Sequence, residues 1–332
     1  MSTGVLPDRP ATAAAGPAAS PAPGLRGLLW LTLRQNRLLL WVLGAALVLA
    51  VVGLLWVHFT CGHIVDELRR TDCYYPASWE RRECWDLVQP IDRPDFWYLE
   101  VLQPAVTALP VLLGVFVGAP LLAQEYERGT IRLVRAQSVS PVRWLAVRLA
   151  VPGLAALAVS GVLAVLMTWV WWTDIVHGPV AFDPPFQAFT YPALGVAPVA
   201  WSLFALTLGA LVGRLVRRTQ PAMFATGALV AAAHAVMAWA RRYFYPAVDQ
   251  TAPVGTAHPT NSWLIDQGVI LPDGTRVRTD SCVLNTTCDT ADASWLRFHP
   301  ADHLVPVQLV EAGLLAVLTL ALLVVLFRRM RG

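Results

Sequence analysis

The chain has 332 residues, of which 56% are hydrophobic and only 14% are charged, and its formal net charge is +3. It contains no lysine, which excludes a phosphate-binding loop of the GxxxxGK[ST] type, because that loop needs its lysine to reach the phosphates. The arginines stand near the ends of long apolar segments, which argues against a nucleic-acid-binding protein. The motifs HExxH and GxSxG are also absent, so no catalytic residue, cofactor site or metal site is predicted.

The N-terminal 37 residues divide into two parts of different composition. Residues 1–24 are rich in Ala, Pro, Gly and Ser and predict a disordered tail, because they cannot bury enough apolar surface to offset the entropy of ordering. Residues 25–37 combine leucines and Trp30 with Arg26, Arg34 and Arg37. This pattern predicts a helix lying in the membrane interface. The alternative is that these residues are the inner end of a longer first span.

Six apolar segments follow, each dominated by Leu, Val and Ala. They are residues 38–59, 101–123, 149–172, 191–213, 221–240 and 304–327. Because about 20 helical residues cover the ~30 Å hydrocarbon layer of a bilayer, each segment is long enough to cross it. The sequence therefore predicts an all-α integral membrane protein, with residues 25–332 forming one domain of six transmembrane helices.

The charges of the connecting segments indicate which side each one faces. The N-terminal segment, residues 124–148, residues 214–220 and the C-terminal tail together hold 15 of the 25 basic residues and three of the 22 acidic residues. Short loops rich in arginine stay in the cytoplasm. Both termini are therefore predicted to be cytoplasmic, and the loops 60–100 and 241–303 to be extracellular.

The cysteines segregate in the same way, since Cys73, Cys84, Cys282 and Cys288 all fall in the predicted extracellular loops. Disulfides persist outside the reducing cytosol. The expected pairs are Cys73–Cys84 and Cys282–Cys288, although four cysteines allow three connectivities and Cys61, at the outer end of the first span, could exchange with them. A zinc site is less favoured, because no CxxC pair is present.

Three polar side chains fall inside predicted spans. Gln308 and Glu311 share one face of the sixth span at a spacing of three residues, and His234 lies midway along the fifth. A carboxylate in the hydrocarbon region is costly and must face a partner or a wet cavity. Two interpretations remain open for each group: a polar spot on a substrate path, or a bond between helices that only orients them.

Residues 118–150 read GAPLLAQEYERGTIRLVRAQSVSPVRWLAVRLA. This segment resembles the first cytoplasmic loop of ATP-binding cassette (ABC) transporter permeases of the type-2 exporter family. Residues matching the family pattern are Glu125, Glu127, Gly129, Thr130, Ser138, Val139, Ser140, Arg143 and Trp144. Two positions depart from it: Pro141 replaces a common basic residue, and Arg148 replaces a usual lysine. Residues 299–331, with Gln308 and Glu311 before an arginine-rich end, are similar to the last span of one bacterial subfamily.

The resemblance implies a permease subunit, without an ATPase site, of an ATP-driven exporter in a bacterial cell membrane. ATP and Mg²⁺ would be bound by separate ATPase subunits, and a second permease copy would complete the transporter. Residues 130–138 would form a coupling helix that docks on the ATPase. The implied coupling residues are Glu125, Tyr126, Glu127, Arg128, Gly129, Thr130, Arg132, Arg135, Ser138 and Arg143.

Several alternatives to this interpretation stay open at the level of the sequence. The loop 124–148 could be a solvated segment whose arginines only set the topology. The whole protein could be a membrane sensor or assembly protein that uses its extracellular loops. A polytopic membrane enzyme is less favoured, because only Glu311 and His234 offer ionisable groups within the spans.

Overall fold

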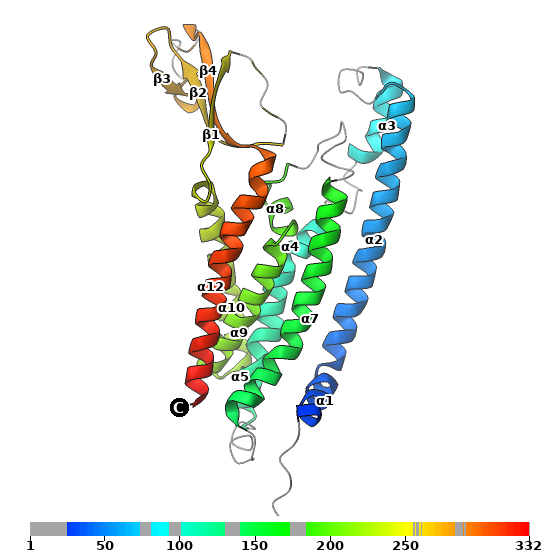
Figure 1. Ribbon diagram of the computed structural model, residues 1–332, viewed down its shortest axis with the longest axis vertical. Helices are drawn as coiled ribbons and strands as arrows, with labels where there is room; N and C mark the ends of the chain where they lie inside the picture. The colour runs from blue at the N-terminus through cyan, green and yellow to red at the C-terminus, as the bar shows by residue number, and fades with distance from the viewer. Residues whose placement is uncertain are drawn as a thin grey trace, which may run out of the picture.

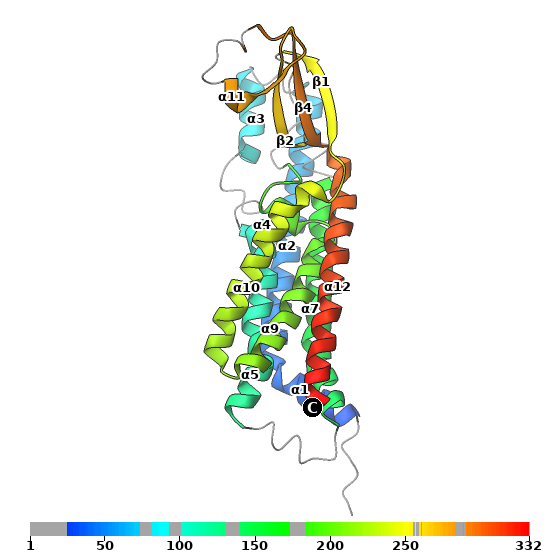
Figure 2. The ribbon, with the colours of Figure 1, turned by 90° about the vertical axis from the view of Figure 1, so that its left-hand side faces the viewer.

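A computed structural model of the chain describes residues 25–73, 81–92, 101–129, 140–172 and 184–331, except positions 255, 257–258, 260, 283–287 and 289. The predicted tail 1–24 and the predicted coupling helix 130–138 lie outside the described residues. Long helices run side by side along the longest axis of the molecule (Figure 1). Helix α1 and the C-terminus lie at one end, and a β-sheet and helix α3 lie at the other (Figures 1 and 2). These are called here the α1 end and the sheet end.

Within the described residues, six helical segments are long and apolar enough to cross a membrane, which agrees with the predicted all-α membrane fold. The first span is α2 (Arg37–Arg70), and the second combines α4 (Gln103–Leu112), the π-helical η3 (Leu113–Gly118) and α5 (Ala119–Glu127). The third is α7 (Pro141–Val170) and the fourth is α9 (Ala197–Val216). The fifth is α10 (Thr219–Ala240) with the short η5 (Arg241–Tyr243), and the sixth is η7 (Ala301–His303) with α12 (Leu304–Arg331).

Shorter elements complete the chain. Helix α1 (Leu25–Gln35) precedes the first span and packs against α7, and a turn at Asn36 separates it from α2. The side chain of Asn36 donates to the Thr32 carbonyl oxygen at 2.8 Å, which stabilises this turn. The remaining short helices are α3 (Arg82–Asp92), α8 (Thr190–Ala193) and α11 (Thr279–Cys282).

The helix ends differ from the predicted spans where local capping signals act. Helix α2 continues to Arg70, past the predicted end at residue 59. Helix α7 begins at Pro141 instead of 149, because the Ser140 hydroxyl accepts the Arg143 backbone N–H at 3.2 Å and proline suits the first helical position. The predicted start of the fourth span at residue 191 is wrong, since the chain breaks between α8 and α9 at Gly195, which has φ of +58°.

Helix α9 is the centre of the bundle and contacts the second span, α7, α10 and α12. In the most apolar 18-residue stretch of α9, 61% of the residues are buried, whereas the corresponding share is 11% for α2 and 17% for the spans of α10 and α12. The outer helices therefore expose apolar side chains over most of their length, for example Leu49, Phe224 and Leu320. Such a surface suits lipid and not water, which supports the membrane assignment.

The second span and α9 approach each other at backbone contact. Gly209 of α9 lies against Gly114 and Gly118 of η3, and Gly213 lies against Ala119 and Ala123, so each helix contributes a GxxxG pair to the contact. A Cβ atom built on Gly209 would lie 2.3 Å from the Gly114 carbonyl oxygen, and one on Gly213 would lie 2.2 Å from the carbonyl oxygen of Ala119. Small residues let membrane helices approach this closely, and the resulting van der Waals packing helps to hold the helices together in lipid.

A four-stranded antiparallel sheet occupies much of the predicted extracellular loop 241–303. Its strands are β1 (Val248–Pro253), β2 (Trp263–Ile270), β3 (Arg276–Arg278) and β4 (Ala293–His299), in the order β1-β4-β2-β3. The structure contains both expected disulfides. Cys73 and Cys84 join the end of the first span to α3 with Cα atoms 5.1 Å apart, and Cys282 and Cys288 are 5.6 Å apart beside the sheet.

Candidate functional site

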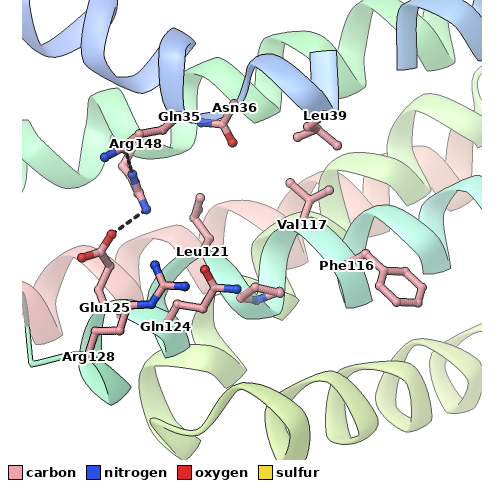
Figure 3. A pocket seen from close by; sticks show the side chains of 11 residues that line it. Gln35, Asn36, Leu39, Phe116, Val117, Leu121, Gln124, Glu125, Arg128 and Arg148 are labelled. Carbon is pink, nitrogen blue, oxygen red and sulfur yellow. Dashed lines mark hydrogen bonds and ion pairs between the residues drawn. The ribbon is translucent and has the colours of Figure 1, made fainter. Parts of the chain in front are cut away.

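At the α1 end, consecutive side chains of α5 reach different neighbouring elements. Glu125 accepts a hydrogen bond from Arg148 Nη2 of α7, with 2.6 Å between Oε1 and the nitrogen. Arg148 Nη1 donates in turn to the side-chain oxygen of Gln35 in α1. Arg148 therefore connects α1, α5 and α7 (Figure 3). A lysine could not present two such donors in a fixed planar geometry, which gives the arginine at this position a physical role.

Tyr126 and Glu127 face the turn between α9 and α10. The guanidinium carbon of Arg214 lies 4.6 Å from the centre of the Tyr126 ring. Glu127 Oε2 accepts both the backbone N–H of Thr219 at 3.1 Å and its hydroxyl at 2.6 Å. Thr219 is the first residue of α10, so the carboxylate satisfies a backbone donor that has no partner within the helix. The end of the second span is thereby fixed to the start of the fifth.

These contacts form one arrangement, called here the α5 clamp: Glu125, Tyr126 and Glu127 with their partners Arg148, Arg214 and Thr219, and Gln35, which Arg148 also binds. The chain leaves the clamp through Arg128 and Gly129, and Gly129 has φ of +72°, a conformation that other residues adopt at a cost. The sequence identified the three α5 residues but none of their partners. It gave no signal for them, because each pairing joins segments far apart in the chain.

The other residues of the predicted coupling loop divide into two groups. Arg128 and Arg143 are exposed at the α1 end, on either side of the undescribed stretch. Thr130, Arg132, Arg135 and Ser138 lie outside the described residues. The coupling role of this segment stays a prediction, whereas the anchoring of its first residues to α1, α7, α9 and α10 is a property of the structure.

A pocket of about 340 Å³ opens beside the clamp, between the α1–α2 junction, the second span and Arg148 (Figure 3). It is lined by Gln35, Asn36, Leu39, Phe116, Val117, Pro120, Leu121, Gln124, Glu125, Arg128 and Arg148. Polar side chains gather at one end of this pocket and apolar ones at the other (Figure 3).

The second candidate site is the buried carboxylate of Glu311, whose side chain is 1% exposed. It accepts the Tyr191 hydroxyl and the Trp201 indole N–H, both at 2.8 Å. Arg241 binds it with two donors, Nε at 2.8 Å and Nη2 at 3.1 Å. A carboxylate offers about four acceptor positions, so these four bonds leave no capacity for a substrate.

Arg241 was missed at the level of the sequence, where it stood at the start of the loop 241–303. The structure buries it, because η5 extends the fifth span by one turn and directs the guanidinium towards α12. Its guanidinium carbon also lies 3.8 Å from the centre of the Tyr191 ring. The only signal was indirect: a carboxylate within a span requires a partner, and Arg241 stands at the same end of the neighbouring fifth span.

Gln308 and His234 complete the surroundings of this cluster. Gln308 Nε2 donates to the carbonyl oxygens of Tyr191 at 3.1 Å and Leu194 at 3.0 Å, which satisfies the end of α8. The His234 ring stacks on Trp201 with 3.6 Å between ring centres. Trp201 thus lies against both His234 and Glu311. The geometry favours the interpretation of Gln308 and Glu311 as bonds between helices over a substrate path.

An aromatic series connects this cluster to the sheet. Phe186 stacks with Tyr191 at 6.1 Å and with Trp263 of β2 at 5.4 Å between ring centres. The ring centres of Trp263 and His299, at the end of β4, lie 5.6 Å apart.

Across the described part of the chain, no group of three His, Cys, Asp or Glu side chains is arranged to hold a metal ion.

Comparison with known families gives one match. A family model described as "ABC-2 membrane transporter related" matches residues 44–242, more than half of the chain. The matched region includes the second to fifth spans, most of the α5 clamp and Arg241, but neither the sheet nor α12. No curated protein and no solved structure matches the chain.

Proposed function

Since the chain belongs to the ABC-2 membrane transporter related family, we propose that this multi-pass membrane protein is the permease subunit of an ATP-driven exporter. Separate ATPase subunits bind ATP and Mg²⁺ at the α1 end, and a second permease copy completes the pathway. The protein has no ATPase site of its own and resides in a bacterial cell membrane. Both termini are cytoplasmic, in agreement with the arginines at that end.

The observation that carries this proposal is the α5 clamp. An ATPase bound to residues 130–138 would exert its force on the chain immediately after Gly129. Just before it, Glu125 bonds to Arg148 of α7, and Tyr126 and Glu127 contact Arg214 and Thr219 at the α9–α10 turn, while Arg148 extends the connection to Gln35 of α1. A displacement of the loop would therefore move several spans together, because side chains on both flanks of α5 hold it to its neighbours. A loop that only set the topology would not need these contacts.

One observation favours a second candidate function. The sheet, α3 and two disulfides form a structured region at the sheet end, as a receptor for an extracellular ligand would need. A sensor or assembly protein of this kind would not hold an ATPase. Purification of the full chain with its genomic neighbours tests both candidates. Export predicts a stoichiometric ATPase in the complex, whereas purification of the chain without one would favour the sensor.

Replacing Glu127 by arginine is expected to uncouple ATP hydrolysis from the permease without preventing folding. The substitution removes the acceptor for Thr219 and adds a cation near Arg214 and Arg217, which both lie over the Tyr126 ring. The measurement is the ATPase rate of the purified ATPase subunits, alone and in complex with the permease. We expect assembly to persist and the stimulation by the permease to fall.

The matched control for this experiment is Glu67→Arg, the same charge change at an exposed residue of α2 near the sheet end. It should leave the stimulation unchanged. Unaltered stimulation in Glu127→Arg would show that the α5 clamp takes no part in coupling.

The proposed orientation predicts opposite labelling of the two ends. In a Cys61→Ser background, a cysteine at position 273, in the turn between β2 and β3, should react with a membrane-impermeant maleimide in intact cells. A cysteine at position 328, near the end of α12, should react only after the cells are lysed. Labelling of position 328 in intact cells would reverse the assigned topology.

A further inference from the structure

The pocket at the α1 end has walls that change from apolar to polar in the same direction. Along the second span the lining residues are Phe116 and Val117, then Leu121, then Gln124 and Arg128. From Phe116 to Arg128, 12 residues further along, a helix rises about 18 Å, comparable to a phospholipid headgroup with the upper part of its acyl chains. On the opposite wall Leu39 is followed by Asn36 and Gln35 towards the same end (Figure 3).

The polar end of this pocket has more cationic donors than anionic acceptors. Two guanidinium groups, of Arg128 and Arg148, face a single carboxylate, that of Glu125. Within the described residues Arg128 forms no ion pair at contact distance, although its charge acts on the nearby Glu127 carboxylate, which does not line the pocket. The Nε atom of Arg148 is buried and has no hydrogen-bond partner there either, although both Nη atoms are bonded. The pocket is therefore electrostatically suited to an anion, and guanidinium groups bind phosphate well.

Two exposed tryptophans on the helices that meet at the α1–α2 junction indicate that the pocket lies at the level of lipid headgroups. Trp30 of α1 and Trp41 of α2 are 58% and 77% exposed, respectively. Exposed tryptophans concentrate at the boundary between the hydrocarbon and the headgroups. Further along α2 towards the sheet end, Val48, Leu49 and Val52 are exposed, as on a lipid-facing helix.

From these observations we propose that the pocket binds an anionic phospholipid of the leaflet at the α1 end, the inner leaflet in the proposed orientation. The phosphate lies between Arg128 and Arg148, and the upper acyl chain lies along Leu39, Phe116 and Val117. The bound lipid joins the α1–α2 junction to the second span next to the α5 clamp. This site depends on the membrane location of the protein and not on its pairing with an ATPase.

Binding can be measured on the full-length protein purified in a neutral detergent, by titration with phosphatidylglycerol, phosphatidylcholine or glycerol 3-phosphate and detection by native mass spectrometry. Phosphatidylglycerol should bind most tightly. Arg128→Gln should weaken it about fivefold, the effect of about one arginine near an anionic membrane surface, whereas Arg128→Lys should retain most of the affinity. The matched control Arg328→Gln removes an exposed arginine at the same end, outside the pocket, and should change nothing.

Three results would overturn the proposal. Equal binding of phosphatidylglycerol by Arg128→Gln and the unmodified protein would show that this pocket does not recognise the lipid. Equal weakening by Arg328→Gln would indicate a general attraction between the arginines and anionic lipid. Equal affinity for glycerol 3-phosphate would show that the pocket takes a free phosphate and not a lipid. Because Arg128 is exposed and forms no ion pair within the described residues, Arg128→Gln should have nearly the same melting temperature as the unmodified protein without lipid, which separates a binding defect from misfolding.

Discussion

Replacing Glu311 by glutamine is expected to lower the free energy of unfolding by about 3–5 kcal/mol, because Arg241 would keep its charge in a buried site without a counter-ion. The carboxylate is 1% exposed and Arg241 is 9% exposed in the same measure, so water cannot replace the lost partner. The same substitution weakens the bonds from Tyr191 and Trp201, which fix α8 and α9 against α12. The measurement is unfolding of the purified protein in detergent, followed by tryptophan fluorescence.

The double variant Glu311→Leu with Arg241→Met distinguishes pairing from other effects of the substitution. It removes both charges together, and replacing a buried ion pair by apolar residues is often close to neutral. We therefore expect it to be more stable than Glu311→Gln. Normal stability of Glu311→Gln together with loss of export would contradict this account and assign the cluster to the substrate path.

Replacing Gly209 by alanine is expected to destabilise the protein by about 1–3 kcal/mol or more, as overpacking of a dense core does. The added methyl group would lie 2.3 Å from the Gly114 carbonyl oxygen and 2.8 Å from the backbone nitrogen of Ala119. Both neighbours are backbone atoms and cannot rotate away, so the second span would have to move away from α9. The measurement is the folded fraction of the purified protein across a denaturant series.

Gly153→Ala is the matched control for this substitution. Gly153 lies within α7, and a Cβ atom there would meet nothing within 4 Å. Alanine favours the helix over glycine by up to about 1 kcal/mol, so this variant should be as stable as the unmodified protein or more stable. Equal stability of the two variants would mean that the GxxxG pairs are not in contact in the membrane.

The spans were predictable from the sequence because crossing a bilayer imposes a local requirement: about 20 consecutive apolar residues satisfy it wherever they occur. The helix ends were less accessible, since they depend on capping by single residues such as Ser140 and on the turn at Gly195. The charge and cysteine distribution indicated the loops that hold the disulfides but left three connectivities open, and the structure contains the two expected pairs, 11 and 6 residues apart.

In the candidate sites, the sequence identified one residue of each interacting pair but not its partner. Glu311 stood out because a carboxylate in an apolar segment is costly, but its partner Arg241 is 70 residues away and resembled a loop residue. The resemblance identified Glu125 and Glu127, yet their partners Arg148 and Thr219 follow from how α5 packs, 23 and 92 residues away. Pairings of this kind depend on the tertiary arrangement, which periodicity and composition do not contain.

The uneven burial of the spans indicates where the bundle can open. Phe186, the cluster around Glu311 and the glycine contacts tie the sheet, α9, α10, α12 and the second span into one unit. The first span contacts the bundle mainly through α7, and only 11% of its most apolar window is buried. Moving α2 outward about the turn at Asn36 would uncover Leu54 and Val57, which pack in the core, and would leave the contacts among the remaining helices in place.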